Sequence, residues 1–326
     1  MQTNQRSPNA LAYLLLLTVG CLIAAMLPLS KMAMAAGATP LAYAFWQSLG
    51  GAMLLSLASV WRTSPVKPRP LHLRYALLSG LTAIAIPNGL AFVLVAKVGA
   101  GLTATLYALP SLLTYGLALS LRMEQVSLAR SLGLSLAVLG CACILWPRDA
   151  SFVDGHSAWM TIGLGVPLSL AIGNIYRSRA WPRGAKSYQL APAMLFAGAL
   201  FLGLLTGLRG ELNTLWLPGA ASKLVAVQAC LTALGYVGFF ELQRRTSPVF
   251  LSQIGFVITL AGLVWGVFLF GEEIDAGVWA GIAIILPGMV LANRADSVVS
   301  HRGFQVIDKQ SRPKGQIVST GVKRIQ

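Results

Sequence analysis

The chain has 326 residues, of which 56% are hydrophobic and only 11% are charged, and its mean hydropathy is +0.70. Soluble domains carry about 25% charged residues, so this composition excludes a soluble globular protein. The formal net charge of +15 is spread over many short segments rather than gathered on one folded domain, which argues against a nucleic-acid partner. The sequence therefore predicts an all-α, polytopic membrane protein that resides in the lipid bilayer.

Apolar runs long enough to cross a bilayer occur ten times along the chain. A hydrocarbon core of roughly 30 Å requires about 20 apolar residues in a helix, and charges or clusters of Gly, Pro and Asn separate the runs. The predicted transmembrane helices cover approximately residues 11–35, 41–61, 75–96, 102–121, 129–146, 158–175, 190–208, 222–240, 249–270 and 278–292. An alternative for the first run is a signal peptide, because Ala33-Met34-Ala35 is similar to a cleavage site. The run is longer than a signal requires, so we expect it to be retained as a helix.

Lys and Arg are distributed unequally between the two sets of loops that these ten helices create. With the N-terminus inside, 20 of the 25 basic residues fall on cytoplasmic segments, including Arg177, Arg179, Arg183 and Lys186 after the sixth helix. Positively charged loops are retained in the cytoplasm. We therefore expect a multi-pass protein of the inner (plasma) membrane with both termini cytoplasmic.

The chain also contains an internal repeat with an offset of 148 residues. This offset aligns Glu124 with Glu272, Gly133 with Gly281, Gly140 with Gly288, Phe92 with Phe240 and Lys97 with Arg245. Because five helices per half is an odd number, the second half enters the membrane from the opposite side, which makes the repeat inverted. The predicted organisation is a cytoplasmic N-terminus (1–10), a first five-helix repeat (11–146), an extracytoplasmic loop (147–157), a second, inverted five-helix repeat (158–293) and a basic, disordered cytoplasmic tail (294–326).

The repeated pattern resembles a known family. Its first copy contains Pro110, then Leu121-Arg122-Met123-Glu124, then Gly133 and Gly140, and its second copy contains Gly271-Glu272, Gly281 and Gly288. This pattern resembles the EamA repeat of the drug/metabolite transporter superfamily over almost all of residues 11–293. The resemblance implies ten helices around a central substrate cavity, alternating access, and export of small substrates such as amino acids, related metabolites or drugs. Ile258 stands where the first repeat has Pro110, so the family proline that bends this helix is absent from the second half.

Polar residues and helix breaks at mid-depth are the features that a transporter requires. Asn88 follows Pro87 midway along the third predicted helix, and the repeat places Tyr236 at the position equivalent to Asn88. We predict that Asn88 and Tyr236 contact substrate; the alternative is that Asn88 satisfies the carbonyl freed by Pro87 while Tyr236 bonds a neighbouring helix. The further predicted substrate contacts are Tyr107, Gln253, Trp265 and Lys31, and the predicted helix hinges are Pro87 and Pro110.

Several of these residues have alternative structural roles. The position of Tyr107 is also typical of packing within a helix bundle. Trp265 could equally anchor its helix at the lipid interface, and Lys31 could extend its ammonium group to the membrane surface. Asn174 and Gln47, the weaker polar candidates, are better explained by hydrogen bonds between helices. Small-residue pairs such as Gly262 with Gly266 favour close helix contact, either inside the bundle or across a homodimer.

Acidic residues are missing from the middle of every predicted helix. The sequence therefore favours facilitated diffusion, exchange or coupling through Glu residues at helix ends over a proton pump with a buried acid. It contains neither a phosphate-binding loop for ATP nor a cluster of metal ligands, so we expect no enzyme, no cofactor and no metal. The predicted function is export of a small amphipathic metabolite. The alternatives are a lipid-linked or nucleotide-sugar carrier and a non-transporting membrane scaffold.

Overall fold

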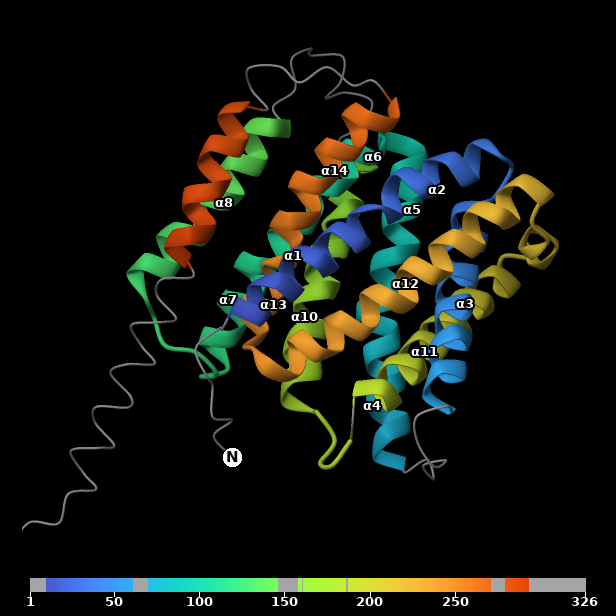
Figure 1. The fold of residues 1–326 in the computed structure, drawn as a ribbon, viewed down its shortest axis with the longest axis horizontal. Helices are drawn as coiled ribbons and strands as arrows, with labels where there is room; N and C mark the ends of the chain where they lie inside the picture. The colour runs from blue at the N-terminus through green and yellow to red at the C-terminus, as the bar shows by residue number, and fades with distance from the viewer. Residues whose placement is uncertain are drawn as a thin grey trace, which may run out of the picture.

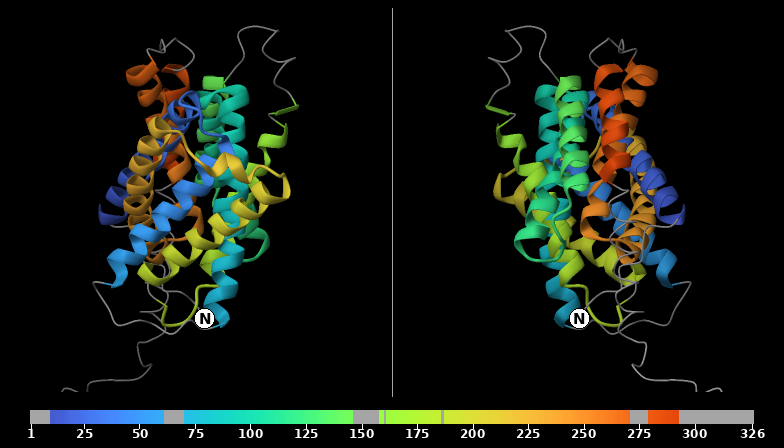
Figure 2. Two further views of the ribbon diagram at one scale, coloured as in Figure 1. Left: turned by 90° about the vertical axis from the view of Figure 1, so that its right-hand side faces the viewer. Right: turned by 90° about the vertical axis from the view of Figure 1, so that its left-hand side faces the viewer.

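The computed structural model describes residues 10–60, 70–145, 158–159, 161–185, 187–270 and 279–292. Within these ranges the chain is helical and contains no β-strand. Figures 1 and 2 show the helices packed side by side in one bundle. The all-α class predicted from the apolar runs is confirmed.

The helices follow one another with short connections. In chain order they are α1 (Ala10–Ala24), α2 (Met26–Ala35), α3 (Pro40–Val60), α4 (Pro70–Gly80), η1 (Leu81–Ala85), α5 (Ile86–Val98), α6 (Ala100–Thr105), η2 (Leu106–Ala108), α7 (Leu109–Ser120), α8 (Leu128–Leu145), α10 (Gly165–Arg179), α11 (Ser187–Leu208), η3 (Leu212–Leu215), α12 (Gly219–Arg245), α13 (Pro248–Ser252) and α14 (Ile254–Phe270). A further helix covers Trp279–Ala292. The segment η1 is a π-helix, whereas η2 and η3 are 3-10 helices.

Five helical stretches are long and apolar enough to cross a bilayer, namely Ala10–Ala35, Pro40–Ser59, His72–Val98, Tyr188–Leu208 and Gly219–Arg245. Shorter apolar helices cover Leu106–Ser120, Leu128–Gly140, Pro248–Gly262 and Trp279–Ala292. Several of the predicted spans are interrupted: among others, η1 separates α4 from α5, η2 separates α6 from α7, and a break at Gln253 separates α13 from α14. These interruptions lie deep in the bundle, where irregular backbone is tolerated only beside protein or a cavity.

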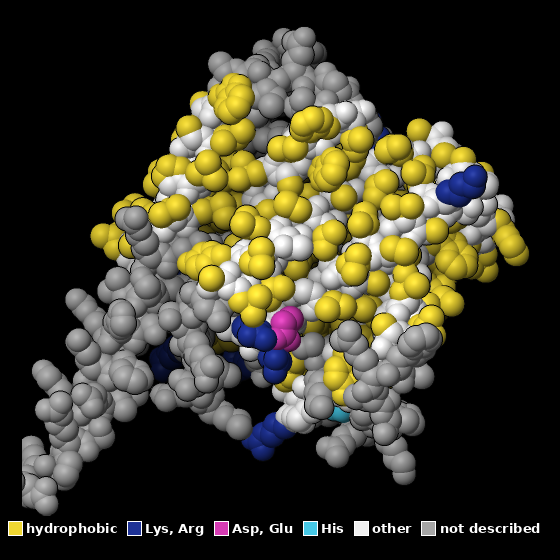
Figure 3. Space-filling model, in the orientation of Figure 1, with side chains coloured by type: hydrophobic (Ala, Val, Ile, Leu, Met, Phe, Trp, Pro, Cys, Tyr) yellow, Lys and Arg dark blue, Asp and Glu magenta, His cyan; other side chains and the backbone are white. Residues whose placement is uncertain are grey.

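The outer surface is strongly apolar, as a bilayer environment requires. Figure 3 shows hydrophobic side chains over most of the face in view, with Lys and Arg near its margins. Leu57, Leu139, Phe268 and Leu208 are between 58% and 87% exposed. A soluble protein rarely exposes apolar patches of this extent, so lipid is the natural solvent for this surface.

Helices at equivalent places in the two halves make equivalent contacts. The helix α1 packs on α14, and the corresponding pair α10 and α7 pack in the same way. The helices α3 and α11 correspond to each other and also pack together: a Cβ on Gly51 would touch Leu195, and one on Gly203 would touch Phe45. Since the earlier residue of one helix meets the later residue of the other, α3 and α11 run antiparallel.

The helix α8 and the helix Trp279–Ala292 are also equivalent in the repeat and pack together with their backbones in close contact. They lie side by side in Figure 1. A Cβ on Gly133 would lie 2.6 Å from the carbonyl oxygen of Gly288, and one on Gly140 would lie 2.7 Å from that of Gly281. Each glycine therefore meets the repeat equivalent of the other, which is the contact pattern of a two-fold axis. The paired glycines of the repeat allow two antiparallel backbones to approach closely.

Candidate functional site

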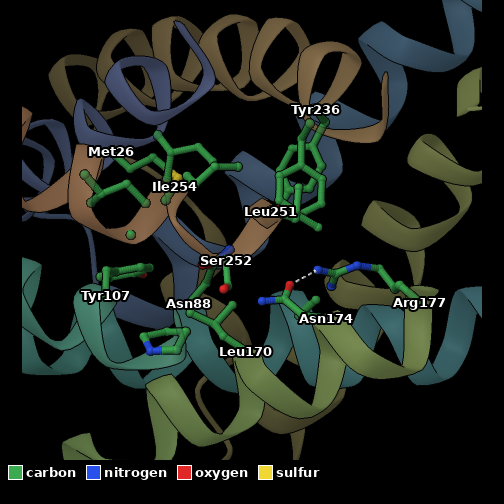
Figure 4. Close-up of a pocket in the computed structure, with 16 residues that line it drawn as sticks. Met26, Asn88, Tyr107, Leu170, Asn174, Arg177, Tyr236, Leu251, Ser252 and Ile254 are labelled. Atoms are coloured by element: carbon green, nitrogen blue, oxygen red, sulfur yellow. Dashed lines mark hydrogen bonds between the residues drawn. The ribbon is translucent and has the colours of Figure 1, made fainter. Parts of the chain in front are cut away.

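A cavity of about 70 Å³ lies between the two halves of the bundle. Holding one water requires roughly 10–15 Å³ by this measure, so the cavity accommodates several waters or part of a small solute. Its lining is mainly apolar, with six polar side chains: Asn88, Tyr107, Asn174, Arg177, Tyr236 and Ser252. Figure 4 shows these residues arriving from several helices, with Tyr107 at one end of the cavity and Arg177 at the other.

The cavity follows the internal symmetry of the chain. Four pairs of lining residues are related by the 148-residue offset: Met26 with Asn174, Asn88 with Tyr236, Tyr107 with Gly255, and Pro110 with Ile258. Equivalent backbone positions therefore surround one shared space. Their side chains differ, so the two halves present different chemistry to that space.

The first break beside the cavity is the π-helix η1, which precedes Pro87. The N–H of Ile86 bonds the carbonyl of Leu81, five residues earlier, so the next N–H in this register would bond Thr82. Pro87 has no N–H, and the carbonyl of Thr82 instead accepts a 2.6 Å hydrogen bond from the Ser169 hydroxyl on α10. This bond stabilises the break, and Asn88, the residue after Pro87, lines the cavity.

The second break is the 3-10 turn η2, which places Tyr107 one turn before Pro110. The carbonyl of Tyr107 lies against Gly255 so closely that any Cβ at residue 255 would overlap it. Only glycine permits this approach between the two equivalent helices. The Tyr107 side chain is 5% exposed and its hydroxyl has no hydrogen-bond partner within the described residues.

Arg177 lies three residues after Asn174 on α10 and is only 1% exposed. Its Nη2 donates to Oδ1 of Asn174 at 2.6 Å, and its Nε donates to Oε1 of Gln243 at 3.2 Å. The guanidinium also lies over the ring of Phe239, 5.1 Å from the ring centroid. The amide of Asn174 in turn donates to Thr114 on α7 at 3.4 Å. These contacts hold one cation beside the cavity.

The comparisons with known proteins agree with this architecture. The model of the EamA-like transporter family matches residues 10–146 and again residues 157–294, which is nearly the whole chain in two copies. The chain belongs to the EamA-like transporter family. It is consequently a multi-pass membrane protein whose chain carries two copies of the family's repeat.

One solved crystal structure resembles this EamA-like chain with a TM-score of 0.64 and 16% sequence identity, covering 85% of this chain and 97% of the other. At this identity the likeness concerns the fold alone. No curated protein matches the chain.

Four of the predicted site residues line the cavity of this EamA-like protein: Asn88, Tyr107, Tyr236 and the hinge residue Pro110. Pro87 is buried next to Asn88. The remaining predicted contacts lie outside the lining. Gln253 is fully buried at the break after α13, Trp265 is 37% exposed on α14, and Lys31 is exposed on α2. Whether any of these residues contacts substrate stays a prediction.

Sequence reasoning missed the charged residue of the cavity. It placed Arg177 in a cytoplasmic loop because the residue follows the sixth apolar run, whereas α10 continues to Arg179 and buries Arg177. The available signal was the spacing of three residues from Asn174, which puts both side chains on one face of a helix. Asn174 does bond a neighbouring helix, as predicted, but it also lines the cavity. Within the described residues, no three His, Cys, Asp or Glu side chains lie close enough to hold a metal ion.

Proposed function

We propose that this EamA-like protein exports a small amphipathic metabolite, such as an amino acid or a related compound, across the inner membrane by alternating access. The observation that carries the proposal is the cavity between the two halves, where polar side chains face an otherwise apolar wall and the Tyr107 hydroxyl has no partner within the described residues. That hydroxyl is buried, and the Asn88 side chain lines the same cavity. Buried polar groups are normally satisfied, so a solute or water is the expected partner.

Alternating access is supported by the breaks beside the cavity. The π-helix before Pro87 and the 3-10 turn before Pro110 interrupt two helices of the first half at cavity depth. In the second half, the break at Gln253 occupies a comparable place on the helix equivalent to α6, η2 and α7. We propose that the halves rock about these breaks, opening the cavity to one side of the membrane at a time.

For the arrangement in the membrane we propose ten spans with both termini in the cytoplasm. The apolar helices described above, together with α10, supply ten segments, and the charge asymmetry of the loops supports this orientation. The protein is proposed to act as a transporter and not as an enzyme. A nucleotide-sugar carrier is less well supported, because a phosphate-bearing substrate favours several cations, and Arg177 is the one cation among the described residues that line the cavity.

A panel challenge tests the proposal. Cells that express the chain are exposed to toxic concentrations of amino acids, amino-acid analogues and drugs, and accumulation of each compound is measured. We expect relief from at least one compound, and we expect Asn88→Ala and Tyr236→Phe to reduce its export about tenfold, the effect of losing one or two hydrogen bonds to the solute.

The matched control is Val237→Ala, because Val237 neighbours Tyr236 on α12 but is 56% exposed on the outer surface. This variant should export at the normal rate. If the panel shows no change in resistance or accumulation, or if both cavity variants act like the parent protein, the scaffold interpretation replaces the transporter.

A further inference from the structure

We propose that Arg177 binds a carboxylate group of the transported compound, so that the substrates of this cavity are amphipathic carboxylates. The inference deepens the proposed function and rests on it. It depends on three properties of Arg177: its burial, its lack of a counter-charge and an unused donor beside the cavity.

The guanidinium is almost fully buried but incompletely bonded. Asn174 and Gln243 accept hydrogen bonds from Nη2 and Nε, whereas Nη1 has no acceptor within the described residues. Residue 173 is glycine, and a Cβ there would lie 3.3 Å from Nη1. The absence of a side chain at Gly173 therefore lets the guanidinium pack closely against the backbone of α10, while the Arg177 side chain still lines the cavity.

No carboxylate of the described chain neutralises this cation. The three acidic residues in the described ranges each pair with another arginine: Glu124 with Arg130, Glu211 with Arg209, and Glu241 with Arg244 and Arg245. The partners of Arg177 are two neutral amides and the face of Phe239. A buried charge without a counter-ion is strongly unfavourable, and a bound anion would offset that penalty.

The rest of the lining indicates what the anion is attached to. Apart from the six polar side chains, the walls are made of residues such as Ile23, Met26, Leu170, Leu251 and Ile258. Figure 4 shows Arg177 at one end of this apolar space. One cation facing apolar walls complements a compound with a single carboxylate at one end and a hydrocarbon body, because a carboxylate forms short, charge-assisted hydrogen bonds with a guanidinium.

The test compares two matched pairs of probes that differ only in charge: 3-phenylpropanoate against 3-phenylpropanamide, and isovalerate against isovaleramide. Binding to the purified full chain in detergent is measured by ligand-dependent thermal unfolding. We expect each acid to bind at least about tenfold more tightly than its amide, since only the carboxylate forms charge-assisted hydrogen bonds with the guanidinium. Arg177→Gln should abolish this preference for the acid over its amide, and Arg177→Lys should retain part of it.

Arg179→Gln is the matched control, because it removes the same charge from an exposed position two residues away on α10. It should bind both acids normally. Equal affinity for acid and amide, failure of both acids to bind, or normal acid binding by Arg177→Gln would each overturn the inference. If Arg177→Gln does not fold, the acid-over-amide preference of the parent protein and of Arg177→Lys still tests the inference.

The outcome is separable from that of the transport proposal. Export of a neutral or cationic compound, with no preference for the acid probes, would retain the transporter and remove the carboxylate site. Binding of acids that depends on Arg177, with no export of any compound in the panel, would retain the site and remove the transporter.

Discussion

Single residues at the cavity are placed by backbone constraints that come from both halves. Gly255 and Tyr107 are related by the repeat, yet one is glycine because the backbone carbonyl of the other occupies the space of its side chain. The hydroxyl of Tyr107 has no hydrogen-bond partner in the part of the chain that the structure describes. The residue type at position 255 is therefore set by how closely two equivalent helices approach each other.

Gly255→Ala should destabilise the protein, because its methyl group overlaps the Tyr107 carbonyl oxygen and forces the backbones apart. We expect a loss of about 1–3 kcal/mol, typical of overpacking, measured as a lower midpoint of thermal unfolding in detergent. Gly116→Ala on α7 is the control, because a Cβ there meets nothing within 4 Å. That variant should be neutral or slightly more stable. Equal stability of the two variants would contradict the close approach.

The helical elements owe their breaks to local sequence and their stability to neighbouring helices. Pro87 removes an N–H at the end of the π-helix η1, but the freed carbonyl of Thr82 is satisfied by Ser169, 87 residues away. One alternative for Asn88 was that its side chain satisfies the carbonyl freed by Pro87. The structure shows that the Ser169 hydroxyl bonds this carbonyl instead. The break is therefore a joint property of α5 and α10.

A double-mutant cycle measures this bond. Ser169→Ala should lower the free energy of unfolding by about 1–3 kcal/mol, because a buried carbonyl loses its donor. In a Pro87→Ala background the restored N–H supplies a new donor to Thr82, so the same change should have a smaller effect. Purely additive effects of the two substitutions would mean that Ser169 does not act on the break.

The whole molecule is two halves related by a two-fold axis, with the cavity on that axis and the charged residues mostly at the ends of the helices. No acidic side chain among the described residues lines the cavity. Glu272, which the 148-residue offset pairs with Glu124, lies outside the described residues. Glu124 is largely buried, but it pairs with Arg130 between α7 and α8 and does not line the cavity, so no carboxylate of the described residues faces the pathway.

We therefore expect transport that does not require a proton gradient. In membrane vesicles preloaded with a compound found by the panel, exchange and downhill movement should continue at a similar rate after a protonophore collapses the gradient. Vesicles without the protein serve as the control, because they show whether the compound crosses the bilayer by free diffusion. Strict dependence of transport on the gradient would contradict this mechanism and would direct attention to acidic residues at helix ends.

The sequence by itself determined the class of the protein. The length of the apolar runs, the scarcity of charge and the 148-residue offset are all visible in the linear sequence and do not depend on how distant segments pack. The sequence also predicted Asn88, Tyr107, Tyr236 and Pro110, since polar residues and proline are conspicuous inside apolar helices. Only the tertiary structure decided that Arg177 belongs to the cavity and that Lys31 and Trp265 lie outside it. A helix continues past its apolar run when other helices cover its next turn, and that cover is supplied by residues far away in the chain.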